Sequence, residues 1–316
     1  MTDSNRDILI AMSVHNGRRH LDDQIASLAD QSGAGRVHLL VRDDGSTDDT
    51  AATLRSLDIA PLTMEVVHGP NLGARDSFIA VLNQAPTTYR VIMLCDQDDV
   101  WLPGKVEIAA RAITSAPPGV PLLYAGRSIV TDSTLHPIGL TAEAPHPLDL
   151  HHVLFKNIAP GHTMAFNQPL LAAFRQSIGP AALMHDWWLS LLAVCLGRIV
   201  FDPEPHTLYR QHGANEIGYA ASPGQRLAAN LKRLVHEDRC LVTRQAHKLR
   251  TSLDGRLTPS DRALLDTFLD QGRLRDRLRY LRHHPMPSSQ GPAIVSSLLY
   301  AAGRYQCDPS GADRRR

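Results

Sequence analysis

The sequence predicts an α/β fold with a doubly wound sheet, followed by a mainly helical C-terminal part. Apolar runs typical of buried strands alternate with helical spacing over the first hundred residues. Acidic turns follow two of these strands, and from Pro223 onward the apolar residues recur at helical intervals. The 316 residues, 43% hydrophobic and 21% charged, suffice for one large or two modest domains and exclude a disordered, collagenous or coiled-coil protein.

The N-terminal elements alternate strand and helix, as in βαβ units. The expected strands are 7–14, 37–41, 62–67 and 91–95, and the expected helices are 21–28 and 73–84. Because right-handed crossovers bring the carboxyl ends of parallel strands to one edge, Asp44, Asp96 and Asp98 are expected together at that edge.

The next hundred residues predict a continuation of the same sheet. The expected strands are 122–124, 161–166 and 199–201, the expected helices are 103–114, 169–176 and 186–196, and 140–152 is expected to be a surface loop. We predict a boundary near Ala221, which gives a domain at 1–221 and a basic, mainly helical region at 222–316.

The two parts carry opposite charge, −8 for residues 1–221 and +9 for residues 222–316. Thr258-Pro259-Ser260-Asp261 predicts a helix start and Gly272 its end. Leucines and arginines over 273–282 form a basic amphipathic helix, and the tail after His284 is expected to be partly disordered. Such a helix suits an anionic membrane surface, a helical bundle or a contact in a homo-oligomer. Nucleic acid is not expected, since aromatics do not interleave with the arginines.

The composition also predicts the cellular location. The four cysteines lie far apart without Cys-x-x-Cys spacing, which indicates a reducing compartment and neither a zinc site nor a disulfide framework. The polar, acidic N-terminus does not resemble a secretory leader. Leu189 to Phe201, the longest apolar run, falls short of a membrane span. We therefore expect a cytoplasmic protein, with peripheral attachment to the inner face of the cell membrane as an option.

Asp96-Gln97-Asp98 follows a strand expected to be buried. Two alternating carboxylates on extended backbone suit a hard cation such as Mg²⁺ or Mn²⁺, which takes one or two protein carboxylates and fills its other positions with phosphate oxygens and water. An isolated motif of this kind is more often a strand-end turn that caps the next helix.

Asp43 to Thr50 form a second acidic strand end, rich in helix-capping residues. At the crevice, Asp44 could accept a hydrogen bond from a nucleobase N–H or a ribose hydroxyl. By itself, this segment too is more often a turn than a site.

Together, these motifs and several others resemble glycosyltransferase family 2 over roughly residues 7–215. The matching segments, in chain order, are Val14–Gly17, Ser27–Gln31, Asp43–Thr50, Asn71–Gly73, Asp96–Trp101, Gly161–Thr163, His185–Trp188 and Tyr209–Gly213. The sequences of segments 95–101, 186–188 and 209–215 are most similar to those of bacterial rhamnosyltransferase-like members of the family. The resemblance implies a GT-A fold, which is a Rossmann-like, doubly wound mixed sheet that binds a nucleoside-diphosphate sugar. His162 departs from the family's usual small residue or cysteine at this position.

The resemblance also implies roles for individual residues. Asp186 corresponds to the catalytic base, and its structural alternative is an N-cap of the helix that follows. The metal site corresponds to Asp98, Asp96 and His212, and Asp96 could instead contact the ribose. The candidates for binding the nucleotide are Asp44, Asp96, Arg75, Arg210 and His15. The three tryptophans flank the proposed acids, and at least one of them is expected in the core.

We therefore expect an inverting, metal-dependent glycosyltransferase that moves a sugar, rhamnose from dTDP-rhamnose in the first instance, to a glycan or lipid-linked acceptor in cell-surface polysaccharide synthesis. One alternative is a sugar-nucleotide pyrophosphorylase, for which His15 to Arg19 would be a faint substitute for the triphosphate loop. The other is a non-catalytic nucleotide-sugar-binding or scaffold protein.

Overall fold

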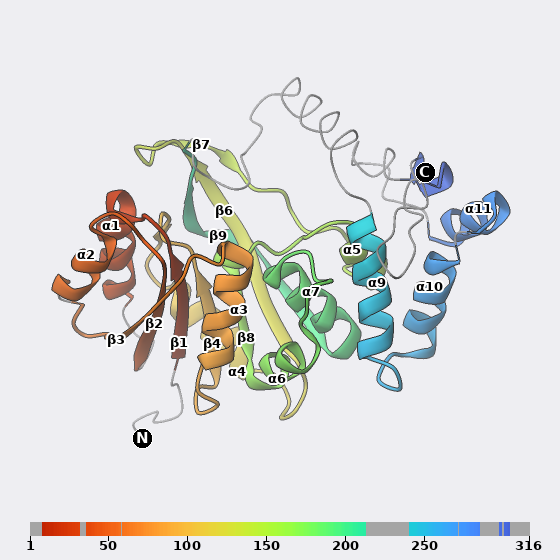
Figure 1. Cartoon of the computed structure of the whole chain (residues 1–316), viewed down its shortest axis with the longest axis horizontal. Helices are drawn as coiled ribbons and strands as arrows, with labels where there is room; N and C mark the ends of the chain where they lie inside the picture. The colour runs from red at the N-terminus through yellow and green to blue at the C-terminus, as the bar shows by residue number, and fades with distance from the viewer. Residues whose placement is uncertain are drawn as a thin grey trace. The chain divides into compact units, whose positions relative to one another are not determined.

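The fold is described from a computed structural model (Figure 1). The structure describes residues 8–31, 36–57, 59–212, 240–270, 272–284, 297–298 and 300–303. The chain divides into two compact units. Unit 1 comprises residues 1–143, 159–175 and 198–219, and unit 2 comprises residues 144–158, 176–197 and 220–316. The predicted boundary near Ala221 stays a prediction.

The first part of unit 1 alternates strands and helices, as predicted. Its elements are β1 (Ile8–Val14), α1 (Arg18–Ala29), β2 (Val37–Asp44), α2 (Thr50–Ser56), β3 (Thr63–Gly69), α3 (Ala74–Gln84) and β4 (Val91–Cys95). Every side chain of β4 is buried, and β1 is buried except at Ser13. Burial on both faces explains why these strands are continuous apolar runs.

These four strands lie in the order β3-β2-β1-β4 and run parallel. Met12 of β1 lies between Val41 of β2 and Cys95 of β4. The carboxyl ends of β1, β2 and β4 therefore meet at one edge, which brings the two acidic strand ends into the same region of unit 1.

The rest of unit 1 makes the sheet mixed. It contains β5 (Val100–Trp101), α4 (Lys105–Thr114), β6 (Leu122–Thr131), β7 (Pro137–Leu140), a 3₁₀ turn (Gly161–Thr163), β8 (Ala165–Asn167) and β9 (Arg198–Arg210). β8 runs antiparallel to both β4 and β6, while β9 runs parallel to β6 and antiparallel to β5. The predicted mixed α/β sheet is confirmed.

Two predicted strands have different bounds in the structure. Gly161–Thr163 forms a 3₁₀ turn in which the Thr163 hydroxyl donates to the Pro160 carbonyl, so the strand begins only at Ala165. β9 runs nine residues beyond the predicted end at Phe201 and ends at Arg210, because it pairs with β6 over its length. This extension brings Arg210 and His212 to the acidic edge.

Unit 2 is helical where the structure describes it. Its helices are α5 (Leu150–Phe155), α7 (His185–Leu196), α9 (Cys240–Ser252), α10 (Pro259–Leu269) and α11 (Leu274–His283), and the boundary between the units passes through the end of α6 (Gln168–Ser177). The predicted N-cap Thr258 accepts a hydrogen bond from Asp261 N. The chain leaves α10 at Asp270, before the predicted end at Gly272.

The expected loop 140–152 is wrong at its C-terminal end, because Asp149 caps α5 by accepting a hydrogen bond from His152 N. The apolar stripe expected at 227–235 and most of the tail after His284 lie outside the described residues. Of the helices that are described, none is both long and apolar enough to cross a bilayer.

Candidate functional site

The turn Asp96–Asp99, which follows β4, forms the centre of the site in unit 1. His212 lies two residues beyond β9, and its Nε2 is 2.7 Å from Oδ2 of Asp98. The side chains of His212 and Asp98 are 14% and 15% exposed, so the pair is still accessible to solvent. Two residues 114 positions apart are thus brought into contact, and their predicted shared role as metal ligands stays a prediction.

Asp96 faces a different histidine. Its Oδ2 is 3.9 Å from Nδ1 of His162, and Asp96, Asp99 and His162 place one potential ligand atom each within 4.8 Å of one another. His162 is buried, stacks on Tyr209 with a centroid distance of 4.5 Å, and has Nε2 2.9 Å from Ser128 Oγ. Burial, reinforced by the cation of Lys105, lowers the pKa of His162 to about 3, so its imidazole is neutral.

Lys105 supplies a positive charge beneath this turn. Its buried Nζ donates to the His162 carbonyl at 2.6 Å and to Thr207 Oγ1 at 2.7 Å, and it lies 3.8 Å from the Trp101 ring centroid. Burial lowers the pKa of Lys105 to about 7, opposed by the anionic forms of Cys95, Asp99 and Asp96. Burial is thus the largest influence on Lys105, and nearby acidic groups favour its ammonium form.

Asp99 is the most buried acid of the turn. Burial, and then the neighbouring carboxylates of Asp96 and Asp98, raise its pKa well above the ordinary value. Its Oδ1 accepts a hydrogen bond from Arg210 N at 3.1 Å, whereas Oδ2 has no hydrogen-bond partner among the described residues. An acid in this position favours its protonated form.

The donor set fits a divalent cation. Carboxylate oxygens suit Mg²⁺ and Mn²⁺, and Mn²⁺ also accepts an imidazole nitrogen. The predicted set was Asp98, Asp96 and His212; the structure joins Asp98 to His212 directly, while Asp96 lies beside His162. Because Asp99 and His162 are buried whereas Asp98 and His212 are accessible to solvent, the pair of Asp98 and His212 is the better fit for a cation, with Asp96 on the same turn.

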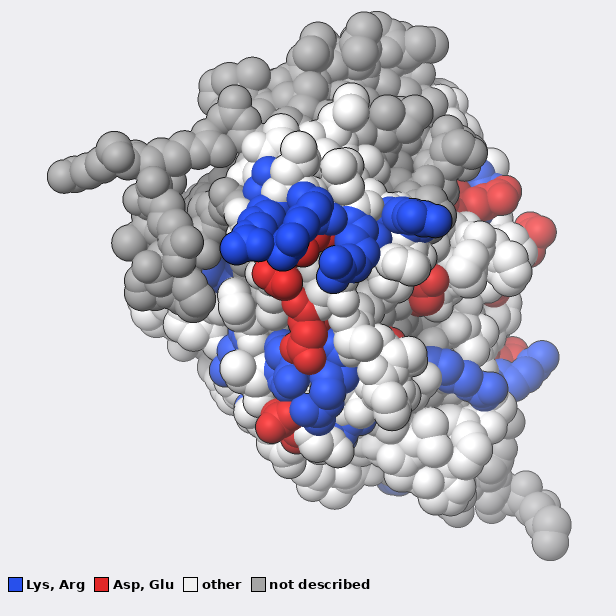
Figure 2. Space-filling view, turned by 90° about the vertical axis from the view of Figure 1, so that its right-hand side faces the viewer, with Lys and Arg blue, Asp and Glu red and all other residues white. Residues whose placement is uncertain are grey.

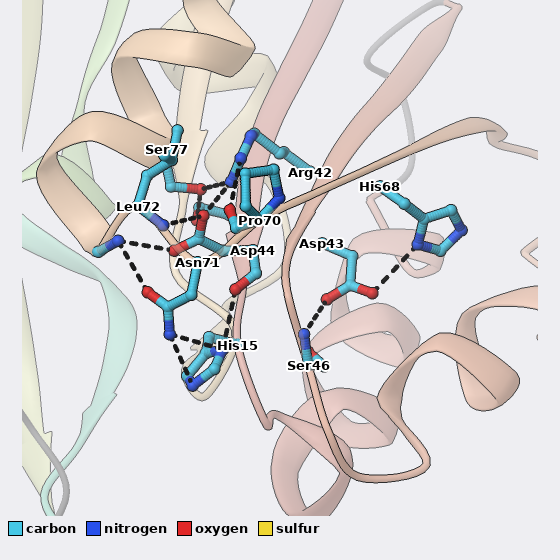
Figure 3. A network of polar contacts seen from close by, with 12 residues as sticks. His15, Arg42, Asp43, Asp44, Ser46, His68, Pro70, Asn71, Leu72 and Ser77 are labelled. Carbon is cyan, nitrogen blue, oxygen red and sulfur yellow. Dashed lines mark hydrogen bonds and ion pairs between the residues drawn. The ribbon is translucent and has the colours of Figure 1, made fainter.

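Asp44 shapes the loop at the end of β3 (Figure 3). Its two carboxylate oxygens accept hydrogen bonds from Leu72 N and Gly73 N, each at 2.9 Å, and it forms an ion pair with Arg42. Arg42 also donates to the Pro70 carbonyl at 2.9 Å. Asp44 is thus a buried anchor in this structure, and its contact with a base or ribose stays a prediction.

His15 links the ends of three strands. Its Nδ1 is 3.0 Å from the Asp44 carbonyl, and its backbone exchanges hydrogen bonds with the Gln97 side chain at 2.8 and 3.1 Å. A Cβ at Gly17 would lie 2.5 Å from Gln97 Oε1, so any other residue there would require the Gln97 side chain to shift. The predicted nucleotide-binding residue His15 therefore lies between the Asp44 and Asp96–Asp99 segments.

The two arginines proposed for the nucleotide have protein partners. Arg75 forms an ion pair with its neighbour Asp76. Arg210 is buried, and its guanidinium contacts Asp98, Ser133 and Asp23. Their predicted roles at a phosphate stay predictions.

Asp186 belongs to unit 2, where it lies in the first turn of α7. Its Oδ1 accepts a hydrogen bond from Trp187 N at 2.7 Å. The alternative prediction of an N-cap is wrong by two positions, since Met184 occupies that place. Trp188 and Trp101 are buried, which confirms that at least one tryptophan serves packing.

Sequence reasoning missed His20, Asp99 and Lys105. His20, on α1, stacks on His212 with ring centroids 5.0 Å apart, and burial together with Arg210, His212 and Arg19 lowers its pKa against the effect of Asp98. Neither His20 nor Lys105 belongs to a motif. Asp99 could have been recognised as the third acid of Asp96-Gln97-Asp98-Asp99.

Comparisons with known proteins support this description. Residues 9–159 match the model of glycosyl transferase family 2. The crystal structure of S. aureus TarS 1-349 in complex with UDP has a TM-score of 0.57 at 13% identity, and the match covers 94% of this chain and 80% of that one. The crystal structure of S. aureus TarS 1-349 in complex with UDP-GlcNAc has a TM-score of 0.56 at 12% identity. That match covers 95% of this chain and 89% of that one. No curated protein sequence matches significantly.

The structural likeness shows the fold, which is the GT-A fold that the sequence predicted. The family match covers the segment that contains Asp44 and the turn Asp96–Asp99. The family match and the fold together indicate a glycosyltransferase.

Proposed function

We propose that the protein is an inverting, metal-dependent glycosyltransferase that transfers a sugar from a nucleoside diphosphate to an acceptor hydroxyl. The observation that carries this proposal is the contact between Asp98 and His212 at the carboxyl ends of the strands, 2.7 Å apart and accessible to solvent. Ligands of open α/β sheets bind at this edge.

Each site residue has a distinct task in this proposal. Asp98, His212 and Asp96 would hold Mg²⁺ or Mn²⁺, and the cation, when bound, would neutralise charge on the leaving diphosphate. Asp44 and His15 order the loops in which the nucleoside would lie. Asp186 is the proposed base, whose carboxylate would take the proton from the acceptor hydroxyl on the face opposite the leaving group, which gives inversion.

The donor and acceptor rest on the sequence resemblance alone. The sequences of Cys95–Trp101 and Tyr209–Asn215 resemble those of rhamnosyltransferase-like proteins, which favours dTDP-rhamnose as the donor. A glycan or lipid-linked acceptor of cell-surface polysaccharide synthesis is the matching acceptor class.

An anionic membrane surface is the proposed partner of α11. Leu274 and Leu278, one turn apart, are 54% and 50% exposed, and Arg273, Arg275, Arg279 and Arg282 around them are exposed as well. Figure 2 shows Lys and Arg side chains gathered on the face that includes this end of the chain. Exposed leucines among arginines suit the boundary between headgroups and acyl chains. Peripheral attachment at the cytoplasmic face would bring the enzyme to a lipid-linked acceptor.

The test compares wild type with Asp186→Asn on a panel of nucleotide sugars with Mg²⁺ or Mn²⁺. We expect wild type to release nucleoside diphosphate, and the variant to turn over ~10²- to 10⁴-fold more slowly with unchanged donor affinity. Ser190→Ala, in the same helix, is the matched control and should keep turnover.

Two outcomes would favour the alternatives. A wild-type protein that binds nucleotide sugar yet releases no diphosphate with any donor or acceptor would be a binding or scaffold protein. Release of pyrophosphate from a nucleoside triphosphate and a sugar phosphate would indicate a pyrophosphorylase.

A further inference from the structure

We propose that Arg210 is a positioning residue that fixes the Asp98–His212 pair for the cation, and that it does not bind the donor's phosphates. The inference rests on the proposed function, because it concerns the cation site of that proposal. It replaces the phosphate-binding role that the sequence suggested for Arg210.

Arg210 holds the turn Asp96–Asp99 through its side chain and its backbone. Its Nε donates to the Asp98 carbonyl at 2.8 Å, and its backbone N donates to Asp99 Oδ1 at 3.1 Å. His212 follows two residues later and meets Asp98 Oδ2. Arg210 therefore fixes both partners, Asp98 through a hydrogen bond and His212 through the end of β9.

The other guanidinium nitrogens fasten this assembly to two further parts of unit 1. One terminal nitrogen donates to the Ser133 carbonyl, beyond β6, at 3.1 Å. The other forms an ion pair with Asp23 of α1 at 2.7 Å. The planar fork of arginine can reach three acceptors in different directions, whereas the single ammonium of lysine cannot do so from one position.

This arrangement argues against a phosphate ligand. The Arg210 side chain is 4% exposed, and all three guanidinium nitrogens have protein acceptors. These acceptors take three of the five N–H donors, and with 4% of the side chain exposed a phosphate could reach the other two only if the surrounding residues moved. Charge-assisted bonds to backbone carbonyls in a buried position are costly to break.

The experiment measures binding of Mn²⁺ alone by electron paramagnetic resonance for wild type, Arg210→Lys and Arg127→Lys. Arg127 is the matched control, since it also donates to a backbone carbonyl in unit 1, that of Thr141, away from the turn. We expect Arg210→Lys to weaken Mn²⁺ binding ~10- to 100-fold, the usual range for groups that orient metal ligands. Turnover of this variant should recover at high Mn²⁺, and Arg127→Lys should bind as wild type does.

Unchanged Mn²⁺ affinity in a folded Arg210→Lys variant, together with weaker binding of the nucleoside diphosphate, would overturn the inference and restore the phosphate role. Should this variant fail to fold, Asp23→Asn removes one anchor of the same guanidinium and leaves the Asp98 carbonyl contact. We expect a smaller loss of Mn²⁺ affinity in Asp23→Asn, and no loss there would also overturn the inference. If wild type and Asp98→Asn bind Mn²⁺ alike, the proposed cation site itself fails.

Discussion

Asp99 and Lys105 in unit 1 and the aromatic cluster in unit 2 are all buried, yet the two regions use opposite chemistry. In unit 1, the buried polar side chains are held by hydrogen bonds, as when Lys105 donates to the His162 carbonyl and Asp99 accepts from Arg210 N. In unit 2, Phe155, Phe268, Tyr280 and Tyr300 pack their rings together, with centroid distances of 4.9–6.4 Å.

This difference indicates that the buried polar residues of unit 1 serve the functional site, whereas the aromatic cluster of unit 2 serves stability. Buried charges cost free energy unless they are paired, so unit 1 holds its acids with a lysine and an arginine at the edge where ligands bind. Aromatic packing gives unit 2 a core of its own and leaves Arg275, Arg279 and Arg282 of α11 exposed. We therefore expect substitutions in unit 2 to change stability or membrane binding without changing the cation site.

The largest effect is expected from Phe268→Ala, in α10. The ring is fully buried against Phe155 and Tyr300, and its loss should lower the free energy of unfolding by about 3–5 kcal/mol. Hydrogen exchange followed by mass spectrometry should show faster exchange in α5, α10 and α11 and unchanged exchange in β1 and β4. Phe166→Ala, in β8, should show the reverse, and equal loss of protection in both units would refute the comparison.

A smaller effect is expected on membrane binding. Replacing both Arg279 and Arg282 with Gln should weaken binding to vesicles that contain phosphatidylglycerol by about 2 kcal/mol, or ~30-fold, because each arginine near an anionic surface contributes about 1 kcal/mol. Co-sedimentation of the protein with vesicles measures this change in binding. Arg55→Gln with Arg111→Gln, two exposed arginines of unit 1, should change nothing.

If the wild-type protein does not bind anionic vesicles, the membrane proposal is refuted. If it instead dimerises in analytical ultracentrifugation and the α11 variant does not, a second copy of the chain is the partner.

The smallest effect is a pH dependence of unit 2. Burial, followed by His152 and His284, lowers the pKa of His151 to about 4, against the effect of Asp149. Because His151 has a lower pKa in the folded state than in the unfolded state, the unfolded state alone binds a proton between pH 6.5 and 4. The free energy of unfolding is therefore highest above pH 6.5 and decreases as the pH falls toward 4. Between pH 7.5 and 5.5 the loss amounts to about 1.4 kcal/mol.

Urea unfolding at these two pH values should show a smaller difference in His151→Gln, which cannot titrate. His136→Gln, an exposed residue of unit 1, is the control and should keep the wild-type difference. An identical difference in His151→Gln and wild type would contradict the prediction. Because Nδ1 of His151 lies 2.7 Å from the Tyr280 hydroxyl, Tyr280→Phe should also change this dependence.

The sequence by itself determined the parallel half of the sheet and its acidic edge. Apolar runs such as Val91–Cys95 predicted strands buried on both faces, and strand direction then brought Asp44 and Asp96 to one edge. It could not determine the length of β9, since Asp202 to His206 are too polar to predict a strand and are held there by pairing with β6.

Only the tertiary structure decided which side chains pair. His212 and His162 are both histidines beside acids in space, yet one meets Asp98 at a solvent-accessible position and the other lies buried beside Asp96. Arg210 belongs to a recognisable motif, but its contacts with Asp98, Ser133 and Asp23 depend on three distant segments. Local sequence specifies strands and turns through spacing and burial, whereas the partners of a buried charge depend on packing between segments that are far apart in the chain.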